Sequence, residues 1–273
     1  MEEGPRRAKG GRLINDERHY PNYGNGRAGQ GFPCGVFGGI VDISVVIPAF
    51  NEEKYIETCL KSLRGQKFAG NYEIIVADDS SEDRTVAVAE KYADRVVVHE
   101  RGSISFGRQK GAEAARYPAI AFTDADSFVA PDWLAQLSAS LEQENVAGVH
   151  GQLMPLDGNS VENNFCRYVL PPYSAFMVGI HQPSVPGANF AVTKKAFEKV
   201  GGFNTKLITA EDVELCKRVK HEGRFLFNRD ALVYVSTRRV REWGYLKVVS
   251  FHVTNSVKIL VLGKADMHYE PIR

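Results

Sequence analysis

The chain has 273 residues, of which 44% are hydrophobic and 25% are charged, which are ordinary values for a globular protein. These values exclude a collagen-like, coiled-coil or wholly disordered chain. The 34 basic and 33 acidic side chains nearly balance, so no strong overall field recruits nucleic acid and we expect no nucleic-acid partner. Residues 1–42 are rich in glycine and lack apolar periodicity, which predicts a flexible N-terminal extension.

The cysteines and the apolar runs indicate the compartment. Cys34, Cys59, Cys166 and Cys216 are scattered and form no CxxC pair, which argues against a disulfide framework or a zinc site and favours a reducing compartment. The N-terminus lacks the apolar core of a secretory signal, and no uninterrupted apolar run reaches the ~18 residues of a spanning helix. We therefore expect a cytoplasmic protein.

From residue 43 onward, short apolar runs typical of buried strands alternate with stretches of helical spacing. In chain order, strands are predicted at 43–48, 72–77, 96–98, 119–123, 224–227 and 231–235, and helices at 52–63, 81–92, 107–115, 131–142 and 211–219. This alternation predicts right-handed βαβ units, and hence an α/β fold with a mainly parallel central sheet flanked by helices.

Polar clusters follow three of these strands, at Ala49–Glu53, Asp78–Ser81 and Asp124–Asp126. In open parallel sheets, ligands bind beyond the carboxyl ends of the strands. We therefore expect the three clusters to meet in one cleft.

The carboxylates of Asp124 and Asp126 can both turn toward one ligand at the mouth of a strand. Like charges held close together need an offsetting cation, and Mg²⁺ or Mn²⁺ binds through one or two carboxylates together with substrate phosphate oxygens. The alternative is an ordinary turn that caps a helix, which would use the same residue types.

Asp79 and Arg108 are candidates for nucleotide recognition, although turn chemistry and a solvated helix position would explain them equally well. No GxGxxG or GxxxxGK[ST] motif follows any predicted strand. This absence disfavours dinucleotide oxidoreductases and P-loop NTPases. It also favours a metal, rather than a backbone nest, as the group that neutralises a bound diphosphate.

Glu211 and Asp212 stand at the start of a predicted helix. Acidic residues there interact favourably with the helix dipole, which is a sufficient structural explanation. The functional alternative is that one of them is a general base that deprotonates an acceptor hydroxyl.

Taken in order, several stretches between about residues 43 and 245 resemble family-2 glycosyltransferases with the GT-A fold, which is a Rossmann-like fold for nucleotide-diphospho-sugar transferases. The matching segments read VIPAFNEE at 46–53, VADDSSED at 76–83, FTDAD at 122–126, GGF at 201–203, ED at 211–212 and RRVREW at 238–243. The resemblance implies an inverting transfer of a sugar from a nucleotide-diphosphate donor to an acceptor hydroxyl.

The resemblance also implies roles for individual residues. Asp126, with Asp124, would hold the metal, and Asp212, with Glu211 as its neighbour, would be the base. The donor site would be formed by Pro48, Ala49, Phe50, Glu52, Asp79, Arg108, Asp124 and Asp126, and the acceptor and diphosphate would meet Asn189, Arg238, Arg241 and Trp243. Two departures stand out, because Arg108 lies in Gly-Arg-Gln where the family usually has Ala-Arg-Asn, and the leading Gln of the Q/R-x-x-R-W box is absent. The second departure favours a single-addition enzyme over a processive polymerase.

The C-terminal stretch, residues 238–273, carries seven basic and three acidic side chains and has apolar residues at helical spacing from Trp243 to Leu260. Two interpretations stay open: a helix packed on the core, or a helix lying in the plane of a membrane surface. The second would suit a lipid-linked acceptor and a peripheral position on the cytoplasmic membrane face. The predicted organisation is therefore an extension (1–42), a GT-A domain (43–240) and a basic amphipathic helix and tail (241–273).

The sequence thus predicts a metal-dependent glycosyltransferase that uses a UDP- or GDP-linked sugar and a glycan or lipid-linked acceptor. A catalytically silent sugar-nucleotide-binding protein is the alternative, although the intact Asp124, Asp126 and Asp212 speak against it. A nucleotidyltransferase would require a glycine-rich basic loop after the first strand, where this chain has Pro-Ala-Phe-Asn-Glu. The sugar, the base, the acceptor and the oligomeric state are left open.

Overall fold

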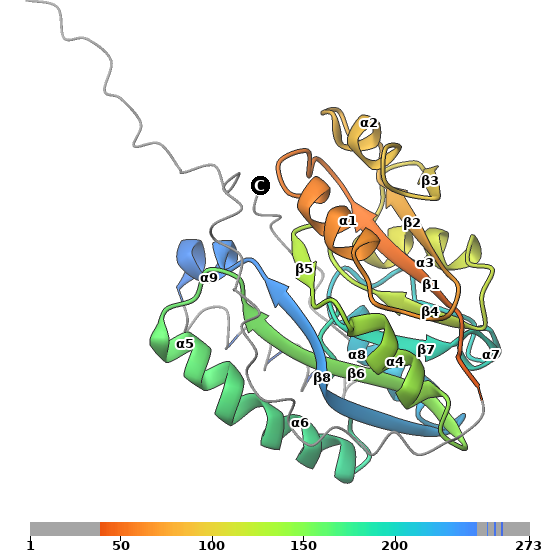
Figure 1. Cartoon of the computed structure of the whole chain (residues 1–273), viewed down its shortest axis with the longest axis vertical. Coiled ribbons are helices and arrows are strands. Elements are labelled where there is room, and N and C mark those ends of the chain that lie inside the picture. The colour runs from red at the N-terminus through yellow and green to blue at the C-terminus, as the bar shows by residue number, and fades with distance from the viewer. Residues whose placement is uncertain (1–38, 245–249, 251–253, 255–257, 259–273) are drawn as a thin grey trace, which may run out of the picture. The chain divides into compact units, whose positions relative to one another are not determined.

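The computed structural model describes residues 39–244 together with residues 250, 254 and 258. Within this part of the chain, one eight-stranded sheet has the order β3-β2-β1-β4-β7-β6-β8-β5 (Figure 1). Its strands are β1 (Ile43–Ala49), β2 (Tyr72–Asp78), β3 (Arg95–Val98), β4 (Ala119–Phe122), β5 (Ser127–Val129), β6 (Val146–Pro155), β7 (Phe190–Thr193) and β8 (Arg224–Val235).

The sheet is mixed but mostly parallel. Strand β1 pairs in parallel with β2 and β4, β2 with β3, and β6 with β8, whereas β7 runs antiparallel between β4 and β6, and β5 runs antiparallel to β8. The predicted α/β class with a mainly parallel sheet is confirmed.

Helices lie on both faces of the sheet (Figure 1). They are α1 (Ile56–Arg64), α2 (Thr85–Ala89), α3 (Ile104–Glu113), α4 (Trp133–Leu141), α5 (Ser160–Asn164), a π-helical turn (Phe165–Val169), α6 (Leu170–Gly179), α7 (Lys194–Lys199), α8 (Glu211–Val219) and α9 (Arg238–Trp243).

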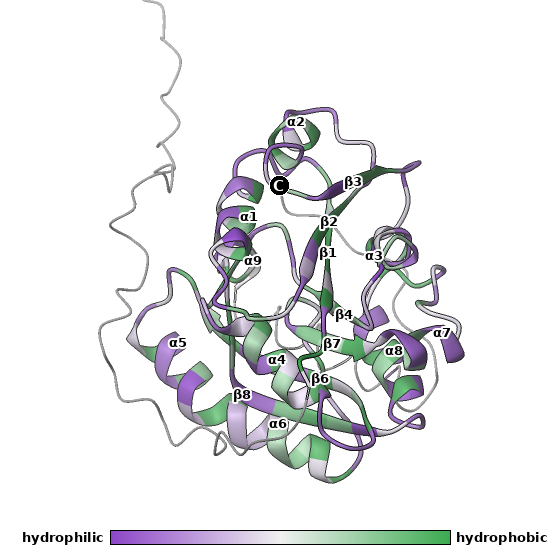
Figure 2. Ribbon diagram, turned by 45° about the vertical axis from the view of Figure 1, so that its right-hand side comes forward, coloured by the Kyte–Doolittle hydropathy of each residue, from purple (hydrophilic) through white to green (hydrophobic). Residues whose placement is uncertain are grey.

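The two faces of β1 explain why its sequence is a continuous apolar run. Val45 and Ile47 pack into the core shared with α1 and α4, whereas Val46 packs into the core shared with α3, α7 and α8. All three side chains are fully buried, as expected for a parallel strand that is covered on both sides. Green ribbon in Figure 2 marks the same apolar character along β7.

Several elements differ from the predicted ones. Helix α1 begins at Ile56 rather than near residue 52, because the N–H groups of Glu52 and Glu53 bond to the side chains of Thr85 and Asp83 instead of entering a helix. Helix α2 is correspondingly short. Strands β5, β6 and β7, helix α7, and the long helical segment from α5 to α6 were not predicted. The two strands predicted after residue 224 are one strand, β8.

Most of the predicted N-terminal extension and of the predicted C-terminal helix and tail lies outside the described residues, so these boundaries stay predictions. Strand β1 begins at Ile43, where the domain was expected to start. None of the helices in the described ranges is long and apolar enough to cross a bilayer.

Candidate functional site

The three polar clusters do lie together, beyond the carboxyl ends of β1, β2 and β4. The N–H of Asn51 donates to Ser81 Oγ at 2.9 Å, which joins the first cluster to the second. Arg238 joins the first cluster to the third, because its guanidinium bonds to both Glu52 and Asp126. Asn51 and Ser80 adopt positive φ angles of 53° and 54°, and such residues turn the chain sharply as it leaves each strand.

Arg108 is the centre of a buried carboxylate cluster. Its side chain, on α3, is only 2% exposed. One guanidinium nitrogen donates to Asp124 Oδ1 at 2.7 Å, and another donates to Glu211 Oε1 in a very short contact. The carboxylates of Asp124, Glu211 and Asp212 together hold the pKa of Arg108 above its usual value, although burial alone would lower it. Arg108 therefore connects the Asp124–Asp126 loop to the start of α8.

Gly187 lies directly on this cluster. A methyl group at its Cα would come within 2.7 Å of an Arg108 Nη atom and 2.9 Å of Asp212 Oδ2. A side chain at position 187 would force the Arg108 guanidinium or the Asp212 carboxylate to shift, because the backbone of the 186–188 loop closely approaches both groups. The loop therefore lies against both the Arg108 guanidinium and the Asp212 carboxylate.

Glu211 and Asp212 both have raised pKa values. Burial raises the pKa of Glu211 to about 7, because the Arg108 charge offsets only part of the desolvation and the Asp212 charge adds to it. Burial also raises the pKa of Asp212, again against the lowering effect of Arg108. Ala210, just before α8, has a φ of 56°, an uncommon conformation that sets the direction in which the two acids leave the backbone. Carboxyl groups tuned toward neutral pH are suited to proton transfer.

A second, more open cluster lies at the rim. Arg238 Nη2 is 2.8 Å from Glu52 Oε1 and 3.2 Å from Asp126 Oδ2, and the guanidinium lies over the ring of Tyr55. Burial raises the pKa of the Glu52 carboxyl, and the hydrogen bond from Arg238 counters part of that rise. The side chains of all three charged residues are about one-fifth exposed.

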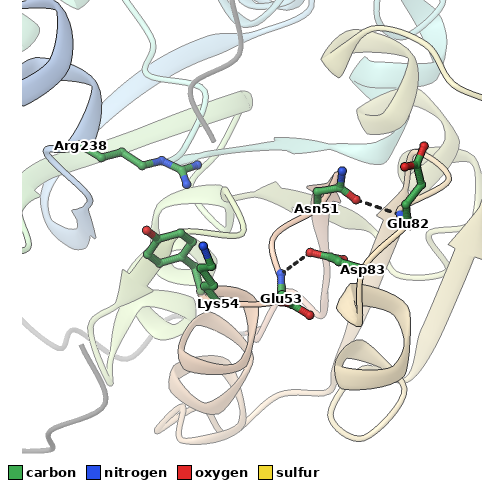
Figure 3. A pocket seen from close by; sticks show the side chains of 7 residues that line it. Asn51, Glu53, Lys54, Glu82, Asp83 and Arg238 are labelled. Atoms are coloured by element: carbon green, nitrogen blue, oxygen red, sulfur yellow. Dashed lines mark hydrogen bonds between the residues drawn. The ribbon is translucent and has the colours of Figure 1, made fainter. Parts of the chain in front are cut away.

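A cavity of about 340 Å³ opens beside Arg238. Figure 3 shows the Arg238 side chain reaching into it from α9, opposite the loop that follows β1. Two hydrogen bonds fix that loop, from Glu82 N to Asn51 Oδ1 and from Glu53 N to Asp83 Oδ2. The cavity is lined by Asn51, Glu53, Lys54, Tyr55, Glu82, Asp83 and Arg238.

The rim cluster fits a divalent cation in one respect. Asp126 and Asp124 leave the same loop with partly exposed carboxylates, which pair with Arg238 and Arg108 in the absence of a cation. In the described part of the chain no three acidic, His or Cys side chains come together as a complete metal cage. Two carboxylates completed by substrate phosphate oxygens are nonetheless a sufficient ligand set for Mg²⁺ or Mn²⁺.

The residues expected to bind the nucleoside lie at the ends of β1 and β2 and in the loops that follow. The Asp79 carboxylate accepts a hydrogen bond from the N–H of Gly102 at 2.6 Å, and burial raises its pKa. The Phe50 ring lies 4.2 Å from the guanidinium carbon of Arg101. Pro48 and Ala49 are the last residues of β1 and lie level with the end of β2.

Two of the residues predicted for the acceptor or diphosphate have partners within the fold, and a third cannot be described. Asn189 is fully buried, and its amide donates to Gln152 O and Ala231 O and accepts from Trp133 Nε1. Arg241 bonds to Asp157 at 2.7 Å. The side chain of Trp243 lies outside what the structure describes. Asn189 therefore serves the interior of the domain, whereas the roles of Arg241 and Trp243 stay predictions.

Other residues of the site were missed. Tyr55 lies under the Arg238 guanidinium, and Asp157 accepts from Thr237 Oγ1 at 2.7 Å and so holds the start of α9. Neither residue belongs to a motif, since each acts on a partner far away in the sequence. The Pro-Gly-Ala-Asn sequence before β7 indicates a turn at Gly187, but it does not predict that Arg108 and Asp212 lie against this glycine.

Comparisons with known proteins agree with this geometry. A sequence model of the family described as Glycosyl transferase family 2 matches residues 44–201, from β1 through α7. This chain belongs to glycosyl transferase family 2. The family resemblance inferred from the ordered sequence motifs is confirmed.

Solved glycosyltransferase structures share the fold. Mannosyltransferase PcManGT from Pyrobaculum calidifontis, in complex with GDP-Man and Mn²⁺, superposes with a TM-score of 0.67 at 20% identity, covering 82% of this chain and 65% of that one. S. aureus TarS 1–349, in complex with UDP-GlcNAc, gives a TM-score of 0.60 at 22% identity over 72% of this chain and 59% of that one. These neighbours are GT-A glycosyltransferases, which confirms the predicted GT-A fold.

Curated relatives of this family 2 member are glycosyltransferases as well. Glycosyltransferase AglE of Haloferax volcanii is 26% identical over 242 residues, which is 82% of this chain and 76% of AglE. Putative glycosyltransferase EpsH of Bacillus subtilis is 40% identical over 100 residues, or 35% of this chain and 29% of EpsH. The chain thus matches under a third of the length of the first curated relatives.

Proposed function

We propose that this family 2 member is an inverting, metal-dependent glycosyltransferase that moves a sugar from a UDP- or GDP-sugar to a hydroxyl of a glycan or lipid-linked acceptor. The observation that carries the proposal is the Arg108 cluster. It holds a donor-side carboxylate, Asp124, and the acids expected to act on the acceptor, Glu211 and Asp212, around one buried guanidinium. Groups for both substrates of a sugar transfer therefore converge within a single site.

On the donor side, the nucleoside would lie along the loops after β1 and β2, against Ala49, Phe50 and Asp79. Asp126, with Asp124, would hold Mg²⁺ or Mn²⁺, which when bound stabilises the negative charge that develops on the leaving diphosphate. Arg238, which pairs with Glu52 and Asp126, would turn toward the phosphate oxygens of the donor. PcManGT was solved with GDP-Man and Mn²⁺, which supports a divalent cation in this fold.

On the acceptor side, Asp212 would be the general base. Its carboxylate takes the proton of the acceptor hydroxyl as the oxygen attacks the anomeric carbon, and the bond from that carbon to the diphosphate oxygen breaks. The configuration inverts because a single displacement occurs. Glu211 bonds to Arg108 and holds the start of α8, so it acts as a positioning residue for Asp212.

Two relatives support the acceptor classes. A relative named glucosyl-dolichyl phosphate glucuronosyltransferase, from Haloferax volcanii, is 26% identical over 81% of this chain. A relative named poly(ribitol-phosphate) beta-N-acetylglucosaminyltransferase TarS, from Staphylococcus aureus, is 29% identical over 74% of this chain. We propose an acceptor of one of these classes, and with the lipid-linked class a peripheral position at the cytoplasmic membrane surface.

The first test is a panel of UDP- and GDP-sugars with Mn²⁺ or Mg²⁺ and then with EDTA, with release of the nucleoside diphosphate and nucleotide binding measured in parallel. Metal-dependent release from one donor would establish the class and name the donor. Absence of both release and metal-dependent binding across the panel would refute the proposal.

The second test separates the base from the donor site. Asp212→Asn is expected to lower transfer at least ~10²-fold, because a positioned general base contributes about 10²–10⁴-fold, while donor affinity stays within about twofold. Asp132→Asn is the matched control, since Asp132 is an exposed acid just before another helix, α4. Equal losses of donor binding and transfer in Asp212→Asn would contradict the assignment.

A further inference from the structure

The segment 203–210 leads from the turn after α7 into α8, and we call it the pre-α8 loop. Its course decides where Asp212 lies, because Asp212 is the second residue of α8. Few apolar side chains hold it in place. None of residues 204–214, all of which the structure describes, belongs to either of the two large hydrophobic cores, and Leu207 and Val213 form a small cluster of their own.

A cavity lies between the pre-α8 loop and the start of α3. Its volume is about 290 Å³, and its lining includes Thr205, Lys206 and Ile208 from the loop and Phe106 from α3. This side of the loop therefore has room to move. Contacts other than close packing must fix the loop in one position.

One face of α3 supplies those contacts. Three hydrogen bonds join α3 and its N-cap to alternate residues of the loop backbone: Gln109 Oε1 accepts from Phe203 N at 2.8 Å, Ser103 Oγ donates to Thr205 O at 3.2 Å, and Ser105 Oγ donates to Leu207 O at 2.6 Å. Ser105, Arg108 and Gln109 are three and four residues apart, so they lie on the same side of the helix. Arg108 extends the series, because it bonds to Glu211 directly after the loop.

Ser105 makes the shortest of the three bonds. Its side chain is fully buried, and Leu207 is buried as well. The single hydroxyl proton of Ser105 goes to the Leu207 carbonyl, while Ser103 Oγ lies 2.7 Å from the same hydroxyl oxygen. Removal of this hydroxyl would leave a buried carbonyl without its donor, in a loop that already has room to move.

Leu207 in turn contacts the start of α8. Its side chain clusters with that of Val213, and Ala210 packs against the same cluster. The N–H of Val213 donates to Asp212 Oδ1 at 2.7 Å, so a displacement of Val213 also displaces a partner of this carboxylate. Ala210 keeps its uncommon φ of 56° only while the surrounding structure holds it there.

We propose that Ser105 is a positioning residue for Asp212, which it holds through Leu207 and the direction in which α8 begins. This role rests on the proposed function, in which Asp212 is the general base. A general base must lie within hydrogen-bonding distance of the hydroxyl that it deprotonates, and a misplacement of about 1 Å can lower the rate by about 10²-fold. Ser105 therefore affects the chemical step rather than the binding of the donor.

The experiment compares Ser105→Ala with Ser140→Ala in the full chain. Ser140 is the matched control because it is another buried serine on a helix, α4, and its hydroxyl donates to Gln136 O at 2.9 Å and accepts from Asn228 at 3.0 Å. With the donor that releases its nucleotide in the UDP- and GDP-sugar panel, Ser105→Ala should lower kcat about tenfold and leave the donor KM within about twofold. Ser140→Ala should leave both constants unchanged.

A double-mutant cycle shows whether Ser105 acts through Asp212. In the Asp212→Asn background, Ser105→Ala should cause no further loss of kcat, because the base that it displaces is already absent. A general loss of structure would instead multiply with the loss caused by Asp212→Asn.

Amide hydrogen exchange reports on the loop in the absence of any substrate. The amides of residues 203–210 should exchange at least ~10-fold faster in Ser105→Ala than in the wild type, because local opening of the loop becomes easier. In Ser140→Ala they should exchange at the wild-type rate.

Three results would overturn the proposal: a wild-type kcat in Ser105→Ala, the same fold loss of kcat in the Asp212→Asn background, or unchanged exchange of residues 203–210. An inactive wild type on every donor would instead refute the proposed function, and with it the role assigned to Ser105. The exchange result would still decide whether Ser105 holds the loop, so the two failures are distinguishable.

Discussion

Replacing Arg108 by methionine keeps most of the side-chain volume and removes the buried cation that bonds to both Asp124 and Glu211. Removing one partner of a buried charge pair typically costs about 3–5 kcal/mol, because the remaining charge is left in a poorly solvated place. For Arg108→Met we expect a loss of unfolding free energy at the lower end of this range, about 3 kcal/mol at pH 8. The Asp124 side chain is 34% exposed and can be rehydrated, and Glu211 can take up a proton.

The pH dependence follows from the pKa of Glu211, which is about 7 in the folded wild-type chain against an ordinary 4.5. Arg108 lowers this pKa, so its loss raises the pKa further. Above pH 7 the wild-type carboxylate is ionised and bonded to Arg108, whereas the variant must keep it protonated or bury its charge. The loss of unfolding free energy caused by Arg108→Met should therefore become smaller as the pH falls. It should decrease by about 1.4 kcal/mol for each pH unit in which Glu211 is ionised in the folded wild type but protonated in the folded variant.

Urea unfolding followed by tryptophan fluorescence at pH 8 and pH 6 measures this cost. Arg84→Met is the control, because Arg84 forms an ion pair with Glu53 while its side chain is 84% exposed, and its loss should be barely measurable. A loss of stability below about 1 kcal/mol for Arg108→Met at pH 8, or a loss that grows toward pH 6, would refute the reasoning about this buried cluster.

Two further substitutions test the same interior. Because folding raises the pKa of Glu211, the unfolding free energy of the wild type falls as the pH rises from about 4.5 to 7. Glu211→Gln should remove this pH dependence. In urea unfolding, the unfolding free energy of the variant relative to the wild type should therefore rise by on the order of 1 kcal/mol or more between pH 5 and pH 8. Trp133→Phe should cost about 1–3 kcal/mol, because it leaves the buried Asn189 Oδ1 without its donor at 2.9 Å; an unfolding free energy unchanged within about 0.5 kcal/mol would contradict that bond.

The first half of the fold could be predicted because the sequence patterns that specify its strands and helices are local. The apolar runs of β1, β2 and β4 end at polar residues, and parallel pairing places these ends at one edge of the sheet. The meeting of Asn51, Ser81 and Asp126 therefore followed from the strand pattern alone. The ordered motifs added the family and the acids at the start of α8.

The second half was less predictable because its signals are mixed. Strand β6 contains two glycines, a histidine and a glutamine, which interrupt any two-residue alternation. Helix α6 begins with two prolines after a π-helical turn, so its residues do not keep a 3.6-residue period. Burial of Arg108 depends on Glu211, a residue 103 positions away, and single-chain spacing carries no information on such a pairing.

The short strand β5 has a consequence for the order in which the chain acquires its site during synthesis. It directly follows Asp126 and pairs antiparallel with the last residues of β8, Val233–Val235, while Asp126 itself bonds to Arg238. The ribosome therefore releases Asp126 and β5 more than a hundred residues before their partners Arg238 and β8 exist, although Arg108, the partner of Asp124, is already present. A nascent chain can complete the β1–β2–β3–β4 half by local pairing. The Asp126 end of the acidic loop, however, gains its partners only after β8 and α9 have left the exit tunnel.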